Sequence, residues 1–406
     1  MTFHLNCLAC EWQSADGDYS DCPRCGGTIN VIYESPEIHL EAGHPGIWKY
    51  ASHLPVSDVA HQVSLGEGNT PLVPARRLGT ELGLPGLHFK IEGGNPTGSY
   101  KDRVATVGVS RLLALNKRAW AATSSGNAGA SLAAYGARAG VEGHLFTIEK
   151  AAPAKLAQIM SYGPRVYSVQ RLGYDPEVEH QTWANIRALC EAQNWLMLVT
   201  ARAFSPHAME GVKTIAFEVC NQLGNEAPNV VYVPVGGGGL LSMCWKGFVE
   251  WRAAGQAKGY PRMVAVQPAG CDSIAQAWRG NRAPQSIPTC ESTISGLQLT
   301  APPDGDLVLR ALRDSEGWAV SVPDEETYRM QAQLARREGL FVEPAAAITV
   351  AAVKSDLEQG RLRGNERVVC LLTGVGFKDT NAVQRMTADY AIRRINAEDI
   401  LTLETS

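Results

Sequence analysis

A chain of 406 residues is longer than a usual single domain, so we expect two domains and an appendage. A hydrophobic fraction of 45% and a charged fraction of 19% are typical of a globular protein with a substantial core. The net charge of −4 at pH 7 leaves no positive surplus for nucleic acid or an acidic membrane. No apolar run reaches the roughly 18 residues of a membrane span, and the start of the chain lacks a secretory signal pattern. We therefore expect a cytoplasmic protein that binds neither nucleic acid nor membrane.

Four of the ten cysteines are clustered near the start of the chain. Cys7, Cys10, Cys22 and Cys25 form the pattern C-x2-C-x11-C-x2-C. Two such pairs can place four thiolates around one ion, so the pattern is typical of a zinc ribbon. Two disulfides or free thiols are the alternatives. Because cysteine fills all four positions, no coordination site is left for catalysis, and we expect a structural zinc within residues 1–40.

The other six cysteines are scattered through apolar stretches. Cysteines in such surroundings usually act as small apolar side chains, and a reducing compartment keeps them as thiols. We therefore expect buried, reduced thiols at these six positions: Cys190, Cys220, Cys244, Cys271, Cys290 and Cys370.

Beyond residue 64, short apolar runs alternate with segments of helical periodicity. The predicted strands are Leu87–Ile91, Ala119–Thr123, His144–Ile148, Val166–Val169, Leu196–Val199, Val230–Val235, Met263–Gln267 and Val368–Leu372. The predicted helices are Val104–Leu115, Ala128–Ala139, Pro153–Tyr162, Val178–Ala192 and Val212–Leu223. Strands separated by helices indicate βαβ units and an α/β fold with mostly parallel sheets. Such sheets bind ligands where strands end and helices begin.

A lysine lies at the start of the first predicted helix, after a turn rich in Gly, Pro and Asn. The segment reads NPTGSYKDR and spans residues 95–103. Ser99 is expected to cap the helix, which puts Lys101 near the positive end of the helix dipole, where a cation is unfavourable. A partly buried lysine there would have a lowered pKa and a nucleophilic amine, as a Schiff-base lysine needs. A solvated lysine at a helix start is the alternative.

Small polar residues follow the predicted strand Ala119–Thr123. They are Ser124, Ser125, Gly126, Asn127 and Ala128. Hydroxyls and backbone N–H groups at a helix start can hold a carboxylate. An ordinary capped turn would have the same composition.

Two further strand ends run into glycines. Four consecutive glycines, Gly236–Gly239, follow the apolar strand Val230–Val235, and they suit a backbone that wraps closely around an anion at a helix start. Because the spacing does not match G-x-G-x-x-G, a phosphate monoester fits better than a pyrophosphate. Thr373 ends the last predicted strand and would point its hydroxyl into the same crevice. The alternative for the four glycines is a flexible turn, and the alternative for Thr373 is a tight connection between a strand and a loop.

A reactive lysine, a monophosphate cradle, a carboxylate-binding loop and a hydroxyl together suit pyridoxal phosphate (PLP) with an amino-acid substrate. The chain resembles the fold type II PLP enzymes, and among them the threonine synthases, over residues 1–380. The most specific matches are LGEGNTPL at 65–72, the lysine segment 95–103, and TGVGFKD at 373–379. An N-terminal zinc ribbon also occurs in some threonine synthases.

The resemblance implies an α/β fold of two domains with mostly parallel, twisted sheets flanked by helices. The implied parts are a large PLP-binding domain (41–105 and 200–380), a smaller substrate-binding domain (106–199) and a C-terminal extension (381–406). It also implies a homodimer.

The resemblance further implies roles for the singled-out residues. Lys101 would bind the cofactor as a Schiff base and later move protons at the substrate carbons. Asn127 would donate to the phenolic oxygen of PLP, Gly236–Gly239 would hold its phosphate, and Thr373 would meet the ring nitrogen. The substrate carboxylate would be held by the loop Ser124, Ser125, Gly126 and Ala128. A neutral hydroxyl at the ring nitrogen makes a weaker electron sink than a carboxylate would, which suits elimination and addition.

The chain also departs from the threonine synthase pattern. An arginine that helps to hold the substrate phosphate in that family is replaced by Ala208, within SPHAMEGVKT at 205–214. A threonine expected after Asn127 is Ala128, and the all-glycine cradle is more familiar from serine and threonine dehydratases. Losing charge-assisted contacts to a dianion weakens its binding. Arg202 and His207 are candidates to compensate.

Two enzymatic functions therefore follow. The first is a threonine synthase-like lyase that forms threonine from O-phosphohomoserine. The second is a divergent PLP-dependent enzyme that eliminates or replaces a β-substituent on a serine- or threonine-like amino acid. A non-catalytic scaffold is disfavoured because Lys101, Asn127 and Thr373 are all present.

Overall fold

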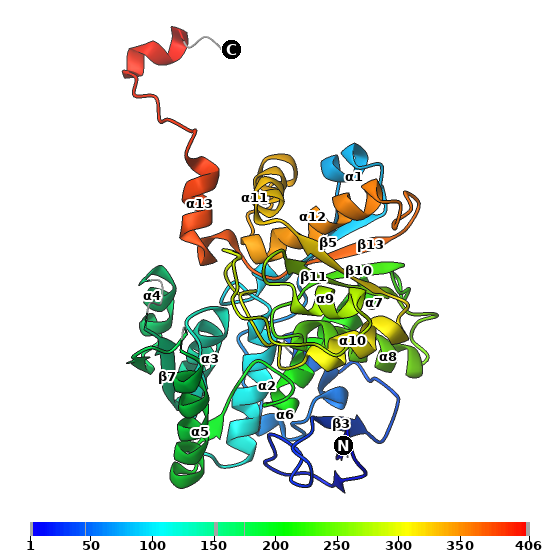
Figure 1. Ribbon diagram of the computed structural model, residues 1–406, viewed down its shortest axis with the longest axis vertical. Helices are drawn as coiled ribbons and strands as arrows, with labels where there is room; N and C mark the ends of the chain where they lie inside the picture. The colour runs from blue at the N-terminus through cyan, green and yellow to red at the C-terminus, as the bar shows by residue number, and fades with distance from the viewer. Residues whose placement is uncertain (1–2, 45, 150–152, 174, 403–406) are drawn as a thin grey trace.

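The computed structural model describes residues 3–44, 46–149, 153–173 and 175–402 (Figure 1). Their strands form three sheets, of three, six and four strands. The strands are β1 (Phe3–Cys7), β2 (Gln13–Ser14), β3 (Ile29–Tyr33), β4 (Leu72–Pro74), β5 (Leu87–Ile91), β6 (Ala119–Thr123), β7 (Glu142–Ile148), β8 (Arg165–Val169), β9 (Leu196–Met197), β10 (Val230–Pro234), β11 (Arg262–Pro268), β12 (Trp318–Val322) and β13 (Val368–Leu372).

Helices surround the two larger sheets. The α-helices are α1 (Arg77–Glu81), α2 (Lys101–Ala114), α3 (Asn127–Ala139), α4 (Pro153–Ser161), α5 (Pro176–Gln193), α6 (Pro206–Met209), α7 (Thr214–Gln222), α8 (Gly239–Ala253), α9 (Ser273–Arg279), α10 (Gly305–Asp314), α11 (Asp324–Gln333), α12 (Pro344–Glu358) and α13 (Thr380–Thr387). The shorter 3-10 segments are η1 (Gly46–His53), η2 (Val59–His61), η3 (Glu92–Gly94), η4 (Glu210–Lys213), η6 (Gly376–Lys378) and η7 (Ala397–Thr402), and η5 (Leu334–Glu338) is a π-helix. In the described part of the chain, no helix is both long and apolar enough to cross a membrane.

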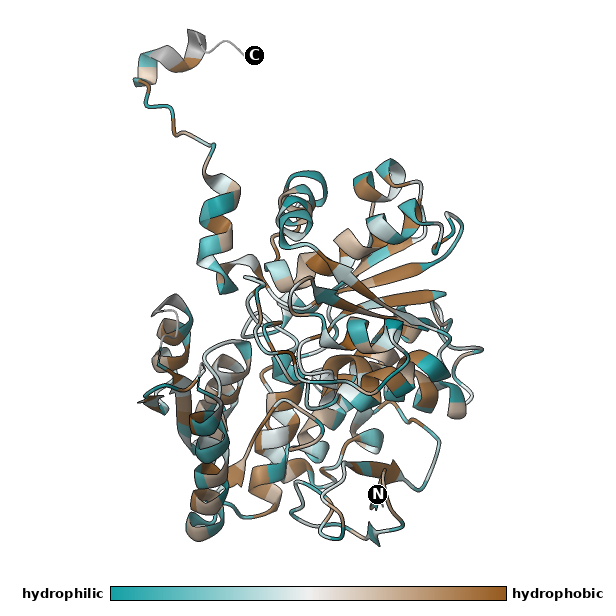
Figure 2. Ribbon diagram, in the orientation of Figure 1, coloured by the Kyte–Doolittle hydropathy of each residue, from teal (hydrophilic) through white to brown (hydrophobic). Residues whose placement is uncertain are grey.

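The six-stranded sheet has the order β12-β11-β10-β13-β5-β4, and only the edge pair β4 and β5 is antiparallel. Its central strands β10 and β13 are buried along their whole length, because helices cover both faces of the sheet. One face packs against α12, and the other packs against α7, α8 and α10. Figure 2 shows strands of this sheet largely in brown, the colour of hydrophobic residues. The expected α/β fold with mostly parallel sheets is confirmed.

The four-stranded sheet has the order β8-β7-β6-β9, and all its pairs are parallel. Helix α3 packs on one face of this sheet, where its apolar side chains share a hydrophobic cluster with Trp120 and Leu145. Helix α5 packs on the other face, against Ala121. The strands of this sheet come from residues 119–197, between two groups of strands that belong to the larger sheet. Both α2 and the segment after β9 lead from one sheet to the other.

The elements agree closely with the sequence prediction where strands are buried on both faces. The strands β5, β6 and β13 have the predicted bounds. The strands β4 and β12 were not predicted, and the predicted strand after residue 195 ends early, because the N–H of Val199 donates to the Ser205 hydroxyl instead of a neighbouring strand. The predicted helix Val212–Leu223 begins as the 3-10 segment η4 and continues as α7.

Two further expectations are wrong. Ser99 does not cap α2, because its backbone pairs with Gly374 and the neighbouring N–H of Tyr100 donates to the Thr373 carbonyl at 3.0 Å. Cys271 and Cys290 are joined by a disulfide and are not reduced thiols. A hydrogen bond of 3.0 Å from Glu291 to the Gly270 carbonyl brings these two distant cysteines together, which apolar surroundings alone do not reveal. The other four scattered cysteines are buried free thiols.

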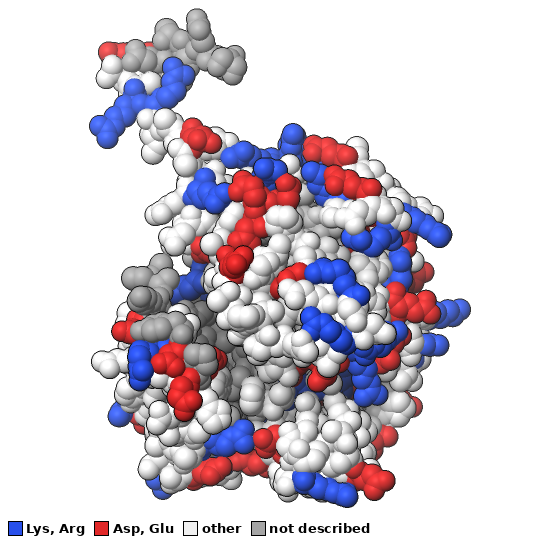
Figure 3. Space-filling view, in the orientation of Figure 1, with Lys and Arg blue, Asp and Glu red and all other residues white. Residues whose placement is uncertain are grey.

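The two ends of the chain pack differently. The small sheet β2-β1-β3 lies against the body of the protein, and three acidic residues between β2 and β3 form ion pairs there: Asp16 with Arg111, Asp18 with Lys117 and Asp21 with Arg187. The helix α13 contacts α11, and the chain beyond it projects away from the body (Figure 1). On the face drawn in Figure 3, acidic and basic side chains are interspersed.

Candidate active site

Three of the predicted loops meet at one edge of the six-stranded sheet. The strands β10, β13 and β5 are adjacent and parallel, so their carboxyl ends lie side by side. The glycine loop follows β10, Thr373 follows β13, and the lysine segment follows β5. The loop 124–128 follows β6 of the other sheet. One contact joins it to this edge, because the Asn127 amide donates to Glu343, which lies beside Thr373.

Lys101 is the first residue of α2, so its predicted position at the start of a helix is confirmed. Its Nζ donates to Thr200 Oγ1 at 2.6 Å and lies 4.8 Å from the centre of the Tyr100 ring. Burial lowers the pKa of Lys101 to about 8, although the negative charges of Glu343 and Asp304 act in the opposite direction. The neutral, nucleophilic amine is therefore far more populated near neutral pH than in an ordinary lysine.

A buried ion-pair network holds the start of α2. Arg103 is fully buried and donates to both Glu92 and Glu218 at 2.8–2.9 Å. Lys90 also donates to Glu218, at 2.7 Å. Glu92 follows β5 and Glu218 lies on α7, so the network ties both to α2 within its first turn, two residues after Lys101.

The glycine loop leads into the N-terminus of α8. Gly238 has a left-handed backbone with φ +95°, and a Cβ at this position would lie 2.8 Å from a Val308 methyl group. A Cβ on Gly239 would lie 2.7 Å from Met209 Cε and 2.9 Å from an Asp304 oxygen. Only glycine fits this close approach, and the first N–H groups of α8 are without intrahelical acceptors. These free N–H groups suit the binding of a phosphate.

Asp304 was not singled out from the sequence, although it lies beside this loop. Its carboxylate accepts the N–H groups of Arg202 and Ala203 at 2.7 and 2.9 Å, and its own N–H donates to the Gly237 carbonyl at 2.9 Å. Burial raises the pKa of Asp304. These contacts fix the chain that carries Thr200, the hydrogen-bond partner of Lys101.

The loop at the start of α3 is built around Ser124. The Ser124 hydroxyl accepts the N–H groups of Gly126 at 3.2 Å and Gly129 at 3.0 Å, which is the contact of a capped turn. Gly126 has open space where a Cβ would be, and Ser125 and Ala128 are partly buried beside it. The capping contact and a carboxylate site are compatible, because the hydroxyl retains its own proton as a donor.

Two lysines and one carboxyl at the site were assigned no role from the sequence. Lys155 on α4 donates to Ser295, and Lys378 on η6 donates to Gln158 of α4 at 2.6 Å. The charges of both lysines act on Glu343. Lys155 lies in a helical stretch without unusual composition. Glu343, by contrast, directly precedes a proline at a helix start, a position that could have drawn attention to it.

The residues expected to compensate for the missing arginine contact the ribbon instead. The Arg202 side chain donates to Asn30 of β3, and His207 Nε2 lies 3.4 Å from an Asp16 oxygen. Ala208 is buried against Gly108, two helical turns along α2 from Lys101. Tertiary packing therefore directs the side chains of both candidates toward the ribbon, and neither contact points to a substrate phosphate.

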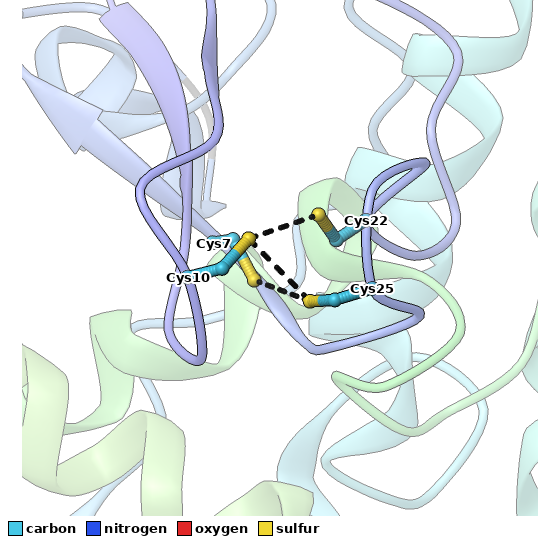
Figure 4. A group of neighbouring side chains, drawn as sticks. All are labelled: Cys7, Cys10, Cys22 and Cys25. Carbon is cyan, nitrogen blue, oxygen red and sulfur yellow. Dashed lines mark hydrogen bonds between the residues drawn. The ribbon is translucent and has the colours of Figure 1, made fainter.

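The four N-terminal cysteines converge, as Figure 4 shows. Cys7 and Cys10 approach from one loop and Cys22 and Cys25 from another, and all four sulfur atoms lie within 4.8 Å of one another. The Sγ atoms are 3.5 Å apart for Cys7 and Cys25, and 3.7 Å apart for Cys10 and Cys22.

The chain belongs to the pyridoxal-phosphate dependent enzymes, since the sequence model of that family matches residues 63–374. It is 39% identical over 375 residues to a threonine synthase of Methanocaldococcus jannaschii, covering 90% of each chain. It is 36% identical over 390 residues to a threonine synthase of Methanosarcina acetivorans, covering 94% of this chain and 93% of that relative. The protein is thus a threonine synthase-like, PLP-dependent lyase.

Solved structures share its fold. Maize serine racemase aligns with a TM-score of 0.66 at 21% identity, covering 79% of this chain and 91% of the racemase. A processed threonine deaminase isoform from Solanum lycopersicum aligns with a TM-score of 0.66 at 19% identity, covering 87% and 97%. The expected fold type II architecture is confirmed.

Proposed function

We propose that Lys101 holds the PLP cofactor as the Schiff-base lysine. Its support is the convergence of a partly buried amine of lowered pKa with Asn127, Thr373 and the glycine loop near one sheet edge. The residues fit the cofactor, because the glycine loop leads into the N-terminus of α8, which has no side-chain cap and whose first N–H groups can hold a phosphate. When bound, PLP supplies an electron sink for carbanion chemistry.

The surrounding residues then have separate tasks. Gly236–Gly239 hold the phosphate, Asn127 donates to the phenolic oxygen, and Thr373 faces the ring nitrogen. The loop of Ser124, Ser125, Gly126 and Ala128 holds the substrate carboxylate through its hydroxyls and N–H groups. Lys101 moves protons at the substrate carbons once its amine is released. In this assignment the domain of residues 106–199 binds substrate, and the parts 41–105 and 200–380 bind PLP.

The reaction we propose is the formation of threonine from O-phosphohomoserine, by elimination of phosphate and addition of water. The relatives that share 34–39% identity with this chain support it. Ala128 and Ala208 supply no donor to a substrate phosphate, but Lys155 and Lys378 bring two ammonium groups to the site from α4 and η6. They are the residues we assign to the phosphate.

A β-elimination or β-replacement on a serine- or threonine-like amino acid is the second candidate. The replacement of two expected phosphate donors by Ala128 and Ala208 favours it. Under this alternative, Lys155 and Lys378 hold the α4 segment over the site and do not bind substrate.

Product analysis separates the two reactions. Purified enzyme loaded with PLP is incubated with O-phosphohomoserine, and inorganic phosphate and threonine are measured. Equal release of both supports the threonine synthase reaction, whereas inertness there with keto acid formed from serine or threonine supports the alternative. A Lys155→Ala variant should raise the KM for O-phosphohomoserine at least tenfold in the first case, the loss of one charge-assisted contact.

The lysine assignment is tested chemically. Borohydride should attach the cofactor to the peptide that contains Lys101, and Lys101→Ala should lose both this label and turnover. A labelled Lys155 or Lys378 peptide, or turnover retained by Lys101→Ala, would refute the assignment.

We also propose that the cysteine cluster binds a structural Zn²⁺. A tetrahedral ion with Zn–S bonds of about 2.3 Å separates its sulfur ligands by about 3.8 Å. The distances of 3.5 and 3.7 Å between sulfur atoms fit that geometry. Its four thiolates leave no open position, so the ion would stabilise the ribbon and take no part in the reaction.

A homodimer in the cytoplasm, free of nucleic acid, completes the proposal. Its support is the resemblance to threonine synthases and the absence of positive charge excess in the composition. Light scattering of the purified protein should give twice the chain mass of 43.7 kDa.

A further inference from the structure

One buried carboxyl connects two residues of the site that come from different sheets. Glu343 accepts the amide of Asn127 at 3.2 Å on Oε1 and 3.1 Å on Oε2. The hydroxyl of Thr373 lies 3.4 Å from the same Oε1. Asn127 begins α3, Thr373 follows β13, and Glu343 directly precedes α12. The carboxyl thus lies where three elements meet.

The backbone holds Glu343 at this point. Its N–H donates to the Gly374 carbonyl at 3.0 Å, and the preceding Val342 pairs with Val375 as a β-bridge. A Cβ on Gly374 would lie only 2.3 Å from Glu343 Oε1. The carboxyl can therefore occupy this position only because residue 374 is glycine.

The direct partners of the carboxyl found in the described chain are an amide and a hydroxyl, so it is not half of an ion pair. The ammonium groups of Lys155 and Lys378 act on it from farther away. A buried carboxyl with neutral partners is costly, and a stabilising role alone would be met equally by an apolar side chain. The free-energy cost of burying the Glu343 carboxyl is therefore evidence for a function that requires a hydrogen-bond acceptor at this position.

That task follows from the shape of a carboxamide. The Asn127 side chain has one oxygen and one NH₂ group, and it can present either face to a ligand. Both oxygens of Glu343 accept from the one nitrogen, and a single N–H shared between them accounts for both contacts, so the second N–H can donate elsewhere. The opposite orientation would point the amide oxygen at Glu343, where two acceptors repel.

We propose that Glu343 is a positioning residue that orients Asn127 and Thr373 toward the two polar atoms on one edge of the cofactor ring. The inference rests on the function proposed above. With the amide held in this way, Asn127 presents an N–H, and not its oxygen, to the phenolic oxygen of PLP. Glu343 thereby favours the ionised phenolic oxygen without itself touching the reacting atoms.

Two substitutions separate orientation from charge. Glu343→Gln keeps a carbonyl oxygen that can accept from Asn127, whereas Glu343→Leu keeps the volume and removes the acceptor. The readouts are the dissociation constant of PLP and the ratio of the visible to the near-ultraviolet absorption band of the bound cofactor. That ratio reports the ionisation of the phenolic oxygen, which a purely structural role would not change.

We expect the Gln variant to remain within threefold of wild type in both readouts. The Leu variant should bind PLP about tenfold more weakly, the scale of one or two lost hydrogen bonds, and its band ratio should shift toward the near-ultraviolet. Thermal unfolding of the PLP-free proteins checks that the variants fold. If the Leu variant does not fold, Gly374→Ala displaces the same carboxyl and should shift the band ratio in the same direction.

The proposal is overturned if a folded Leu variant, or Gly374→Ala, retains the wild-type ratio and PLP affinity. It is equally overturned if the Gln and Leu variants change alike, since charge would then be the cause. Failure of the underlying function looks different: wild-type protein itself would then develop no visible band and no borohydride label on Lys101.

Discussion

Replacing Arg103 with methionine should destabilise the protein by about 3–5 kcal/mol, the usual cost of leaving a buried charge without its partner. The guanidinium donates from Nε and Nη2 to Glu92 at 2.8 and 2.9 Å, and from Nη1 and Nη2 to Glu218 at 2.8 Å each. All three side chains are buried. Burial alone would raise the pKa of Glu218, but the charges of Arg103 and Lys90 hold it well below its usual range.

Methionine keeps most of the length and the apolar part of the arginine side chain, so the loss of stability measures the contribution of the guanidinium group. Glu218 retains Lys90 at 2.7 Å, whereas Glu92 retains only neutral donors among the described residues, Thr70 and Asn95. Arg103→Lys keeps the charge but cannot reach both carboxylates with a planar fork, so its loss should be intermediate.

The exposed pair of Arg329 and Glu326 offers a matched control. These side chains are 62% and 43% exposed, and Arg329→Ala should cost less than about 1 kcal/mol. The measurement is urea unfolding followed by circular dichroism, with the stability difference taken from the midpoint at an unchanged slope. A loss below about 1 kcal/mol for Arg103→Met would refute the reasoning, because the network would then not behave as a buried one.

Three further outcomes are expected. Gly238→Ala should lower thermal stability by at least about 1 kcal/mol and weaken PLP binding, because φ is +95° and a Cβ would clash, whereas Gly360→Ala, at φ +69° with open space, should leave PLP binding unchanged. Cys7→Ser should reduce the zinc content from about one ion per chain to none by elemental analysis, and an unchanged content would refute the metal assignment. Burial alone would raise the pKa of Glu210, but the charges of Lys213 and Lys246 lower it to about 2. Its contribution to stability is therefore complete above pH 4.5 and disappears as the pH falls to about 2, so the advantage of wild type over Glu210→Gln should shrink across that interval in urea titrations.

The lysine segment 95–103 shows how much local sequence can predict. The position of Lys101 at a helix start was predicted from the turn residues before it, and it is the first residue of α2. The cap was predicted wrongly, because Ser99 is engaged in a bridge to Gly374, a residue 275 positions away in sequence. Long-range pairing of this kind has no local signature.

The candidate active site likewise contains residues that the sequence revealed and residues that it did not. Glycines and hydroxyls at strand ends were recognisable, since a parallel sheet always brings such ends to one edge. Glu343 and Asp304 were missed, because each acquires its role only from partners on other elements. The environment of Arg202 and His207, two candidates for holding a substrate phosphate, could not be predicted either, because packing turns both side chains toward the ribbon.

The sequence by itself determined the α/β class and the PLP-dependent family, and it singled out Lys101 as the candidate Schiff-base lysine, because periodicity, turn residues and motif spacing are local properties. Only the tertiary structure decided which side chains surround that lysine. It joined Asn127 to Glu343 across two sheets and placed Arg103 between two buried carboxylates. It also closed the disulfide of Cys271 and Cys290. The physical reason is that burial and long-range contacts, which set pKa and orientation, exist only once the chain is packed.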